Sequence, residues 1–347
     1  MRIILSSTLI FVFIFTLLAL AKPTFDNTPV TLSWSFLPNT LVGCMGTAGV
    51  CLDGKYYQIC GCSGGYQDYD RAQIFDGVSW SQSPCQHPMG VFDHSVAVWN
   101  NKIVVSGGGS YPPPSWCNYT TLYDPTAQTW VQSTPMPQSY MEATAMASVG
   151  DKCYLFGGWN GLNSLHNTYA WSPGDAAMVP KTNMPDVRSA PAAATYNGKI
   201  YIFGGSINYT AVGNNIWEYN PSSDSWTVKS TTLIQATGGA TAVTIGDKIY
   251  VMGGFNINDD GTNTVQVYDP INNTISLGPP LLYATSGHAA GGYTIPLSNS
   301  TYMGKIFISG GGWSIIPYNT AILGTVTGVT FNKVQPESLG VLKALYK

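Results

Sequence analysis

A pair of adjacent glycines that follows a lysine-opened apolar segment recurs six times along this chain of 347 residues, and this repeat limits the fold more than any other feature. The spacing between successive doublets is 43, 50, 47, 49 and 57 residues. A short apolar segment opened by lysine precedes the doublets, as in Lys199–Phe203 and Lys248–Met252. Self-similarity at such a period is typical of repeat architectures, in which one unit cannot bury its apolar face alone. The doublets are Gly64–Gly65, Gly107–Gly108, Gly157–Gly158, Gly204–Gly205, Gly253–Gly254 and Gly310–Gly311.

A second hairpin is predicted after most doublets. In Tyr123–Trp130, Tyr219–Trp226 and Tyr268–Ile275 an aromatic residue ends one strand, an Asx-Pro step turns the chain, and a large apolar residue begins the next strand. Phe75–Trp80 is a shorter version, and the third repeat has Tyr169 without the later tryptophan. With 38 glycines and 22 prolines the chain favours many short strands and excludes long helices.

These motifs resemble the Kelch-repeat family over almost the whole chain. The resemblance implies an all-β fold, a six-bladed Kelch-type β-propeller of four-stranded antiparallel blades around a central channel. Its blades are expected at about 44–88, 89–137, 138–185, 186–234, 235–281 and 282–335, within a propeller of residues 22–347. A strand around Trp34 is expected to close the ring in blade six. A further outer strand at 329–334 then has no place assigned.

The first 21 residues predict export. Arg2 precedes an apolar stretch, Ile3–Leu20, which ends in the small-residue step Ala19-Leu20-Ala21. This order is that of a cleaved signal peptide, here residues 1–21, with a retained membrane anchor as the alternative. Glycosylation sequons at Asn118, Asn208, Asn272 and Asn299 agree with a secreted, extracellular glycoprotein.

Seven cysteines lie between residues 44 and 153. In an oxidising compartment they predict local disulfides with one thiol left over, and the pairing stays open. Cys60 and Cys62 are expected on one strand face and hence not bonded to each other. They lack the second Cys/His pair of a zinc site, so no metal is expected. The seven are Cys44, Cys51, Cys60, Cys62, Cys85, Cys117 and Cys153.

The amino-acid composition limits the kinds of partner that the chain is expected to bind. Only 10% of residues are charged and the formal net charge is −3, so no basic field exists to hold a nucleic acid. No motif indicates a cofactor, no later segment is long and apolar enough for a membrane span, and a monomer is expected. The oxygen-rich segment 256–263 lacks the spacing of a calcium loop and is interpreted as a hydrophilic turn.

Catalytic candidates are few. His94 and His288 are interpreted as structural residues of first strands. A sialic-acid mutarotase-like epimerase, also a Kelch propeller, requires a glutamate base and an arginine to hold the substrate's carboxylate. Arg188 and Glu142 are weak candidates for those two roles, which keeps a sugar-acting enzyme as the alternative function.

The favoured function is binding. Kelch propellers present loops at one face for recognition, and here those loops are rich in aromatic and neutral polar residues. Such groups suit stacking on sugars or docking a protein. The chain is therefore expected to recognise an extracellular glycan or protein and to lack catalysis. The binding candidates are Tyr111, Trp116, Trp159, Trp313 and Tyr318.

Overall fold

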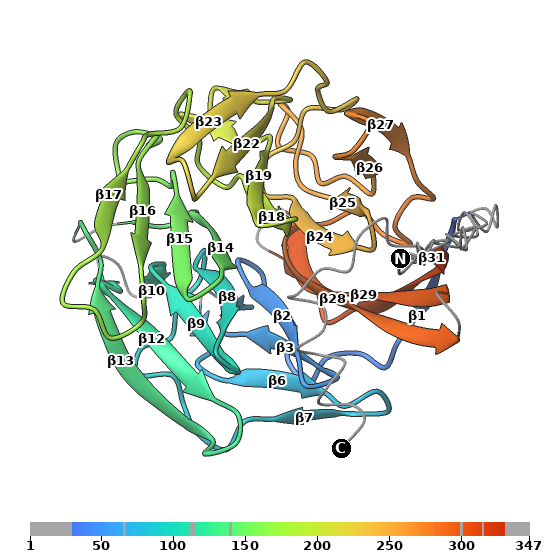
Figure 1. Cartoon of the computed structure of the whole chain (residues 1–347). Coiled ribbons are helices and arrows are strands. Elements are labelled where there is room, and N and C mark those ends of the chain that lie inside the picture. Colours follow the sequence, from blue (N-terminus) through green and yellow to red (C-terminus); the bar gives the residue numbers. More distant parts are fainter. Residues whose placement is uncertain are drawn as a thin grey trace, which may run out of the picture.

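The computed structural model describes residues 30–64, 67–110, 115–138, 141–298, 301–313 and 316–329. These residues form six four-stranded antiparallel blades arranged in a ring (Figure 1). The all-β, six-bladed propeller is therefore confirmed. The predicted leader and Asn299 lie outside the described residues, within which no helix is long and apolar enough to cross a membrane.

Each blade runs from the channel outwards. Blade one has β2 (Ala48–Leu52), β3 (Lys55–Ile59), β6 (Ala72–Phe75) and β7 (Trp80–Gln82). Blade two has β8 (Ser95–Trp99), β9 (Lys102–Ser106), β12 (Tyr119–Asp124) and β13 (Thr129–Pro135). Blade three has β14 (Ala145–Val149), β15 (Lys152–Phe156), β16 (Thr168–Trp171) and β17 (Val179–Lys181).

The second half of the ring repeats this order. Blade four has β18 (Ala192–Tyr196), β19 (Lys199–Phe203), β22 (Ile216–Asn220) and β23 (Ser225–Val228). Blade five has β24 (Thr241–Ile245), β25 (Lys248–Met252), β26 (Val265–Asp269) and β27 (Thr274–Leu277). Blade six has β28 (Ser286–Ser298), β29 (Thr301–Trp313), β31 (Ala321–Val329) and β1 (Thr31–Phe36).

Short strands extend the loops that follow the second strand of a blade. They are β4 (Cys62–Ser63), β5 (Gln67–Asp68), β10 (Gly109–Ser110), β11 (Ser115–Trp116), β20 (Ser206–Ile207), β21 (Ala211–Val212) and β30 (Ile316–Pro317).

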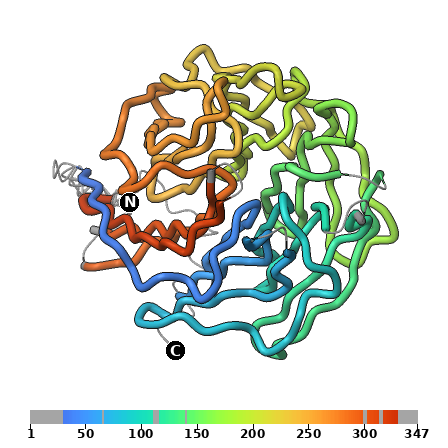
Figure 2. The backbone as a smooth tube through the Cα atoms, turned by 180° about the vertical axis from the view of Figure 1, so that it is seen from behind, coloured from blue at the N-terminus to red at the C-terminus, as the bar shows by residue number. Residues whose placement is uncertain are grey.

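The ring closes through the N-terminal strand, as expected. β1 pairs antiparallel with β31 from Thr31↔Thr327 to Phe36↔Ile322, so it is the outermost strand of blade six. Figure 2 shows this segment running along the outside of the last blade before the chain enters blade one. Of the further outer strand expected at 329–334, Val329 is the last residue of β31, and residues 330–334 lie outside the described part.

The glycine doublets join neighbouring blades. Gly157 and Gly158 follow β15 with φ of 58° and 105°, and the amide of Gly158 donates to the carbonyl of Arg188 in the next blade at 2.8 Å. A Cβ on Gly157 would lie 2.3 Å from that carbonyl oxygen, so no side chain fits. Blade six uses the same bond to reach blade one, from Gly311 to Cys44, which closes the ring a second time.

The first doublet was assigned wrongly. β3 ends at Ile59, and the left-handed pair that follows it is Cys60–Gly61, with φ of 46° and 112°. The amide of Gly61 makes the inter-blade bond to Val91 at 2.8 Å. Gly64 lies further along the loop, where an added Cβ would meet nothing within 4 Å, and Gly65 lies outside the described residues. A cysteine in place of the first glycine hid the repeat.

The aromatic hairpin residues fill the space between blades. Tyr219 pairs with Trp226 across β22 and β23. Both rings pack edge-on against Phe156 of blade three, with centroid distances of 5.8 and 5.7 Å. Such edge-to-face contacts between large rings bury much apolar surface. The aromatic pair of blade four therefore fills the space against blade three.

The cysteines do not form the expected disulfides, because all seven are free thiols. Cys44 lies beside the Cys60–Cys62 segment, because a Cβ on Gly61 would lie 3.0 Å from the Cys44 Cβ, whereas Cys51 lines the channel and Cys153 packs in the core between blades two and three. Cys60 and Cys62 do not share a strand, since Cys60 takes the left-handed turn and Cys62 begins β4. Burial raises the pKa of the Cys153 thiol to about 12, which keeps it protonated.

Candidate functional site

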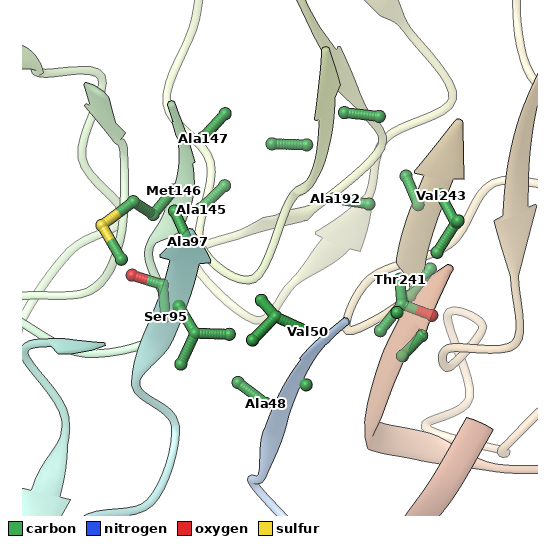
Figure 3. Close-up of a pocket in the computed structure, with 18 of the residues that line it drawn as sticks. Ala48, Val50, Ser95, Ala97, Ala145, Met146, Ala147, Ala192, Thr241 and Val243 are labelled. Atoms are coloured by element: carbon green, nitrogen blue, oxygen red, sulfur yellow. The ribbon is translucent and has the colours of Figure 1, made fainter. Parts of the chain in front are cut away.

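The central channel is a cavity of about 420 Å³ lined by the first strands of the blades. Its wall is made mostly of alanine, valine, glycine and threonine, and Figure 3 shows these short side chains facing the open space. Apart from the buried Cys51 thiol, its titratable lining residues are Asp93, His94 and His288. The wall of the channel therefore has few side chains that could bind a ligand or react, and the polar and aromatic side chains lie at one mouth of the channel.

A ring of hydrogen bonds surrounds that mouth. One residue per blade has a left-handed backbone with φ between 47° and 61°; it lies just before the first strand in blades one to five and at the start of that strand in blade six. Its amide donates to the carbonyl of the equivalent residue in the preceding blade at 2.6 to 3.3 Å, and the amide of Thr47 closes the circle onto Gly287. We call these residues the collar: Gly46, Asp93, Ala143, Ala190, Gly239 and Gly287.

Asp93 is the ionisable residue of the collar. A Cβ on Gly46 would lie 2.7 Å from its Oδ1, so its carboxylate lies over the backbone of blade one. Burial raises the pKa of this carboxyl to about 6. No ion pair is formed by Asp93 among the described residues.

Aromatic residues and a glutamate lie beside Asp93 on the same face. A Cβ on Gly109 would lie 2.8 Å from the ring of Trp116, 2.9 Å from that of Phe92 and 3.2 Å from Glu142 Oε2. These three side chains therefore converge above Gly109. Glu142 also bridges through its backbone to Trp159 of the next loop.

Tyr209 completes this group. It packs edge-on against Trp159 with a centroid distance of 4.9 Å. As a residue it is 56% exposed, yet its pKa is raised by burial and by the carboxylates of Asp93 and Glu142, while a hydrogen bond with Ser189 opposes the shift. Its hydroxyl end therefore points inward. We call Phe92, Asp93, Trp116, Glu142, Trp159 and Tyr209 the rim cluster.

The backbone at Tyr209 is strained. Asn208 and Tyr209 are consecutive left-handed residues, with φ of 51° and 54°, in the tight turn between β20 and β21. Such a turn normally favours glycine at the second position. The turn is anchored by Ser164 of blade three, whose amide donates to Asn208 Oδ1 at 2.7 Å. A tyrosine held in this conformation is a candidate functional residue.

The charges on the two faces differ. The doublets end the second strands at the collar face, so the lysines that open β3, β9, β15, β19 and β25 lie at the opposite face. Several pair there, as Lys102 does with Asp124 at 2.6 Å and Lys248 with Asp269 at 2.5 Å. The collar face carries carboxylates together with Arg71 and Arg188, whose carbonyls accept from Cys60 and Gly158 there, and Asp259 contributes to the raised pKa of Tyr209.

Arg188 does not line the channel. It is 2% exposed and lies between blades, where its guanidinium donates to Asp186 at 2.8 Å and to Asn215 at 2.9 Å. It also stacks over Trp217 at 4.6 Å from the ring centroid. Arg188 thus pairs with Asp186, whereas Glu142, the other catalytic candidate, lies beside Gly109 on the collar face.

The histidines at the channel are buried. His288 Nε2 bonds to Thr241 Oγ1 at 2.8 Å while its Nδ1 has no partner, and the ring of His94 lies against the backbone of Ile59. Burial lowers the pKa of His94 to about 3 and that of His288 to about 4. Among the described residues no group of three or more His, Cys, Asp or Glu is arranged to hold a metal. In the segment 256–263, Asn256 Oδ1 accepts from the amides of Asn258 and Asp260 in a polar turn.

The remaining sequence candidates lie at several places. Tyr318 is half-buried and packs edge-on against Tyr283 at 5.8 Å, away from the loops that carry the rim cluster. Tyr111 and the side chain of Trp313 lie outside the described residues. Of the sequon asparagines, Asn118, Asn208 and Asn272 are exposed. Sequence reasoning missed Phe92, Asp93 and Tyr209; the available signal was a tyrosine at a turn that favours glycine.

Comparison with known proteins decides the family. Residues 143–338, more than half of the chain, match the KLHDC2/KLHL20/DRC7 Kelch-repeats domain, and residues 90–137 match the Kelch motif. The chain belongs to the Kelch-repeat family. The Kelch propeller also resembles the solved structure of YjhT with a TM-score of 0.68 and 14% identity, covering 84% of this chain and 99% of that one.

Similar curated proteins are diverse. Spermatocyte protein spe-26 of Caenorhabditis elegans is 30% identical over 179 residues, which is 50% of this Kelch chain and 31% of that protein. Kelch-like protein 36 of Bos taurus is 26% identical over 45% of this chain and 26% of its own length. N-acetylneuraminate epimerase of Pasteurella multocida is 33% identical over 28% of this chain and 26% of its own length. The chain thus spans about a third or less of these relatives.

Proposed function

We propose that this Kelch propeller is an exported recognition protein that binds an extracellular protein or glycan through the rim cluster. The observation that carries the proposal is that four aromatic rings and two carboxylates lie together on the collar face, beside a channel whose wall has few polar or reactive groups. Exposed aromatic rings with polar neighbours are the usual anchors of recognition surfaces.

Local similarity to an epimerase favours a sugar-acting enzyme as the second candidate. Such chemistry on an acidic sugar requires a positive group that faces the substrate. Arg188 is buried between blades and already paired, so this chain supports binding better than catalysis.

Export is proposed from the leader and the sequons. Signal cleavage after Ala21 yields a mature chain that begins at Lys22, and the exposed amides of Asn118 and Asn272 are accessible to glycosylation. Expression in a secretory eukaryotic cell line checks this. We expect medium-borne protein with Lys22 at its N-terminus and a mass that falls on treatment with peptide N-glycosidase; a cell-bound chain with an intact leader contradicts it.

Binding is tested with the purified mature chain on a glycan array and on a panel of extracellular proteins. The double variant Trp159→Ala/Tyr209→Ala is expected to lose binding, and Phe36→Ala, an exposed aromatic on the outer strand β1, is the matched control. Conversion of N-acetylneuraminate anomers is measured in parallel. Turnover that survives in the double variant, with no ligand on either surface, would overturn the proposal in favour of the enzyme.

A further inference from the structure

The turn between β20 and β21 carries a glycosylation sequon, Asn208-Tyr209-Thr210, on the collar face. Ser164 of blade three holds this turn through two hydrogen bonds. The Ser164 amide donates to Asn208 Oδ1 at 2.7 Å, and the Asn208 amide donates to Ser164 Oγ at 2.8 Å. Within the turn, the amide and the hydroxyl of Thr210 both donate to the Ile207 carbonyl at 3.0 Å. The Asn208 side chain therefore has one fixed orientation, reaching from blade four to blade three.

This orientation leaves the nitrogen of the Asn208 side chain available for a glycan. A backbone N–H only donates, so the atom that the Ser164 amide contacts is the oxygen Oδ1, and Nδ2 is the other atom of the side-chain amide. Asn208 is exposed, and its Nδ2 has no hydrogen-bond partner among the described residues. N-glycosylation joins a sugar to Nδ2 and leaves Oδ1 as an acceptor. Both hydrogen bonds to Ser164 are therefore kept when the site is glycosylated.

The other described sequons lie in different places. Asn272 lies in the turn between β26 and β27 at the opposite face, where its Nδ2 donates to Asp269 at 2.8 Å. Asn118 directly precedes β12, the third strand of blade two. Of these sequons, that of Asn208 is the one that contains a residue of the rim cluster, Tyr209. A glycan on Asn208 is therefore the one that begins within the rim cluster itself.

An exposed apolar surface borders the Asn208 amide. Leu162 is 78% exposed in the loop between β15 and β16, two residues before Ser164, and Tyr209 is exposed as well. Trp159 pairs with Ser164 across that loop and packs against Tyr209 at 4.9 Å between ring centroids. Pyranose rings stack their C–H faces on aromatic side chains, so sugars attached at Asn208 have an apolar surface to lie on. The attached glycan is thus a covering group for side chains that are otherwise left in water.

We propose that Asn208 carries an N-linked glycan whose first sugars lie on Trp159, Tyr209 and Leu162 and restrict access to the rim cluster. This inference rests on the proposed export, because the glycan is added to secreted chains. The donor is a lipid-linked oligosaccharide pyrophosphate. Its anomeric carbon forms a bond to Nδ2 as the bond from that carbon to the pyrophosphate oxygen breaks. Nδ2 loses one proton, and the lipid pyrophosphate leaves.

The glycan then acts as a competitor that belongs to the chain. It occupies the aromatic side of the mouth, at Trp159 and Tyr209, which the proposed function assigns to an external ligand. Because it is covalently attached, its local concentration at the mouth is high whatever the concentration of the external ligand. Chains with an unmodified Asn208 are therefore expected to bind an external ligand more tightly than glycosylated chains.

Two substitutions at Thr210 separate the glycan from the fold. Thr210→Val removes the sequon and keeps the shape of the side chain, whereas Thr210→Ser keeps the sequon and is the matched control. The parent and both variants are expressed with the natural leader in a secretory eukaryotic cell line. Their peptides are analysed by mass spectrometry after release of glycans with peptide N-glycosidase in heavy-oxygen water. We expect Asn208 to be converted to labelled aspartate in the parent and in Thr210→Ser, and not in Thr210→Val.

Hydroxyl-radical footprinting of the folded proteins measures whether the glycan covers the rim cluster. We expect Trp159 and Tyr209 to be oxidised at least twofold faster in Thr210→Val than in glycosylated Thr210→Ser. Phe36, exposed on the outer strand β1, is the internal reference and is expected to react equally in both. Matching circular dichroism and thermal midpoints show that the variants are folded. The folded parent treated with peptide N-glycosidase provides the same comparison without a substitution at Thr210.

The outcomes distinguish this inference from the proposed function. A secreted chain with unmodified Asn208, or a glycosylated chain whose Trp159 and Tyr209 react as fast as in Thr210→Val, refutes the inference and leaves export and rim binding standing. A chain retained in the cell with its leader intact refutes export and the glycan together. If the glycan and its footprint are found but the arrays show no ligand, recognition fails and the inference stands. Any ligand found is expected to bind Thr210→Val at least threefold more tightly than Thr210→Ser, and equal binding overturns the restriction of access.

Discussion

Replacement of Arg188 tests whether its buried charge stabilises the propeller or whether the side chain only fills space. The carbonyl of Arg188 accepts the inter-blade bond from Gly158, and the side chain points between blades. The equivalent position in the other blades holds an uncharged buried residue in each case: Cys44, Val91, Met141, Thr237 and Thr285. We expect Arg188→Met to change the free energy of unfolding by less than about 1 kcal/mol.

The magnitude follows from opposing contributions of similar size. Hydrogen bonds from the guanidinium to Asp186 and Asn215 contribute about 1.5–3 kcal/mol each, and the stacking on Trp217 up to about 2 kcal/mol. Removing the charge from water costs several kcal/mol, and the buried Nε has no partner, which costs about 1–3 kcal/mol more. Methionine fills most of the volume and leaves no buried charge, because the side chain of Asp186 is 55% exposed and becomes hydrated.

Arg188→Ala is the contrasting variant. It removes the same charge but leaves a cavity beside Trp217, so we expect a loss of about 2–4 kcal/mol. Equilibrium unfolding in urea, followed by far-ultraviolet circular dichroism, measures both variants against the parent. The reasoning is refuted if the methionine variant loses about 3 kcal/mol or more, as much as the alanine variant, because the charge would then be a net stabiliser.

Four further outcomes are expected. The free energy of unfolding is expected to fall as pH decreases from about 6.5 toward 4. Burial lowers the pKa of His87 and His288 to about 4 and that of His94 to about 3, below the 6.5 of an unfolded histidine, so the unfolded chain binds more protons in that window. Asp93, whose pKa is raised to about 6, has the opposite effect, and urea midpoints measured against pH show which effect is larger. Thr241→Ala leaves His288 without its hydroxyl partner and is expected to cost about 1–2 kcal/mol in urea unfolding, whereas no loss would mean that water replaces the hydroxyl. Trp34→Ala removes a half-buried ring that packs on Gly324 and donates to Pro279 at 2.9 Å, with an expected loss of about 2 kcal/mol against none for Phe36→Ala, as read from thermal and urea midpoints. Alkylation with iodoacetamide under denaturing, non-reducing conditions is expected to add seven groups by mass, and fewer would indicate disulfides.

The sequence predicted the fold well because each blade repeats a local pattern. Lysine-opened strands, left-handed turns and the Tyr–Trp hairpin are set by neighbours within ten residues, so they can be recognised without tertiary information. The first doublet was misplaced because the left-handed position holds Cys60, and a cysteine with positive φ is not apparent from residue type. Ring closure by β1 required pairing between segments nearly 300 residues apart, which only the spare Trp34 strand suggested.

The rim cluster was harder to predict for a physical reason. A propeller assembles its mouth from one short loop per blade, so residues about 50 positions apart become neighbours and no local motif records the site. Trp116 and Trp159 were identified because tryptophan is conspicuous in a loop, whereas Asp93 and Tyr209 depend on backbone conformations that residue type does not reveal.

The repeat nevertheless provides a way to find such residues once the ring is known. Equivalent positions have the same backbone, so a residue whose type departs from its five counterparts differs for a reason other than the fold. The collar is otherwise glycine and alanine, and its exception is Asp93; the turn at Asn208 favours glycine, and its exception is Tyr209. Both exceptions lie on the collar face, near enough for the carboxylate of Asp93 to help raise the pKa of Tyr209. Two independent departures from the repeat that converge in space support a functional mouth more strongly than any single side chain there does.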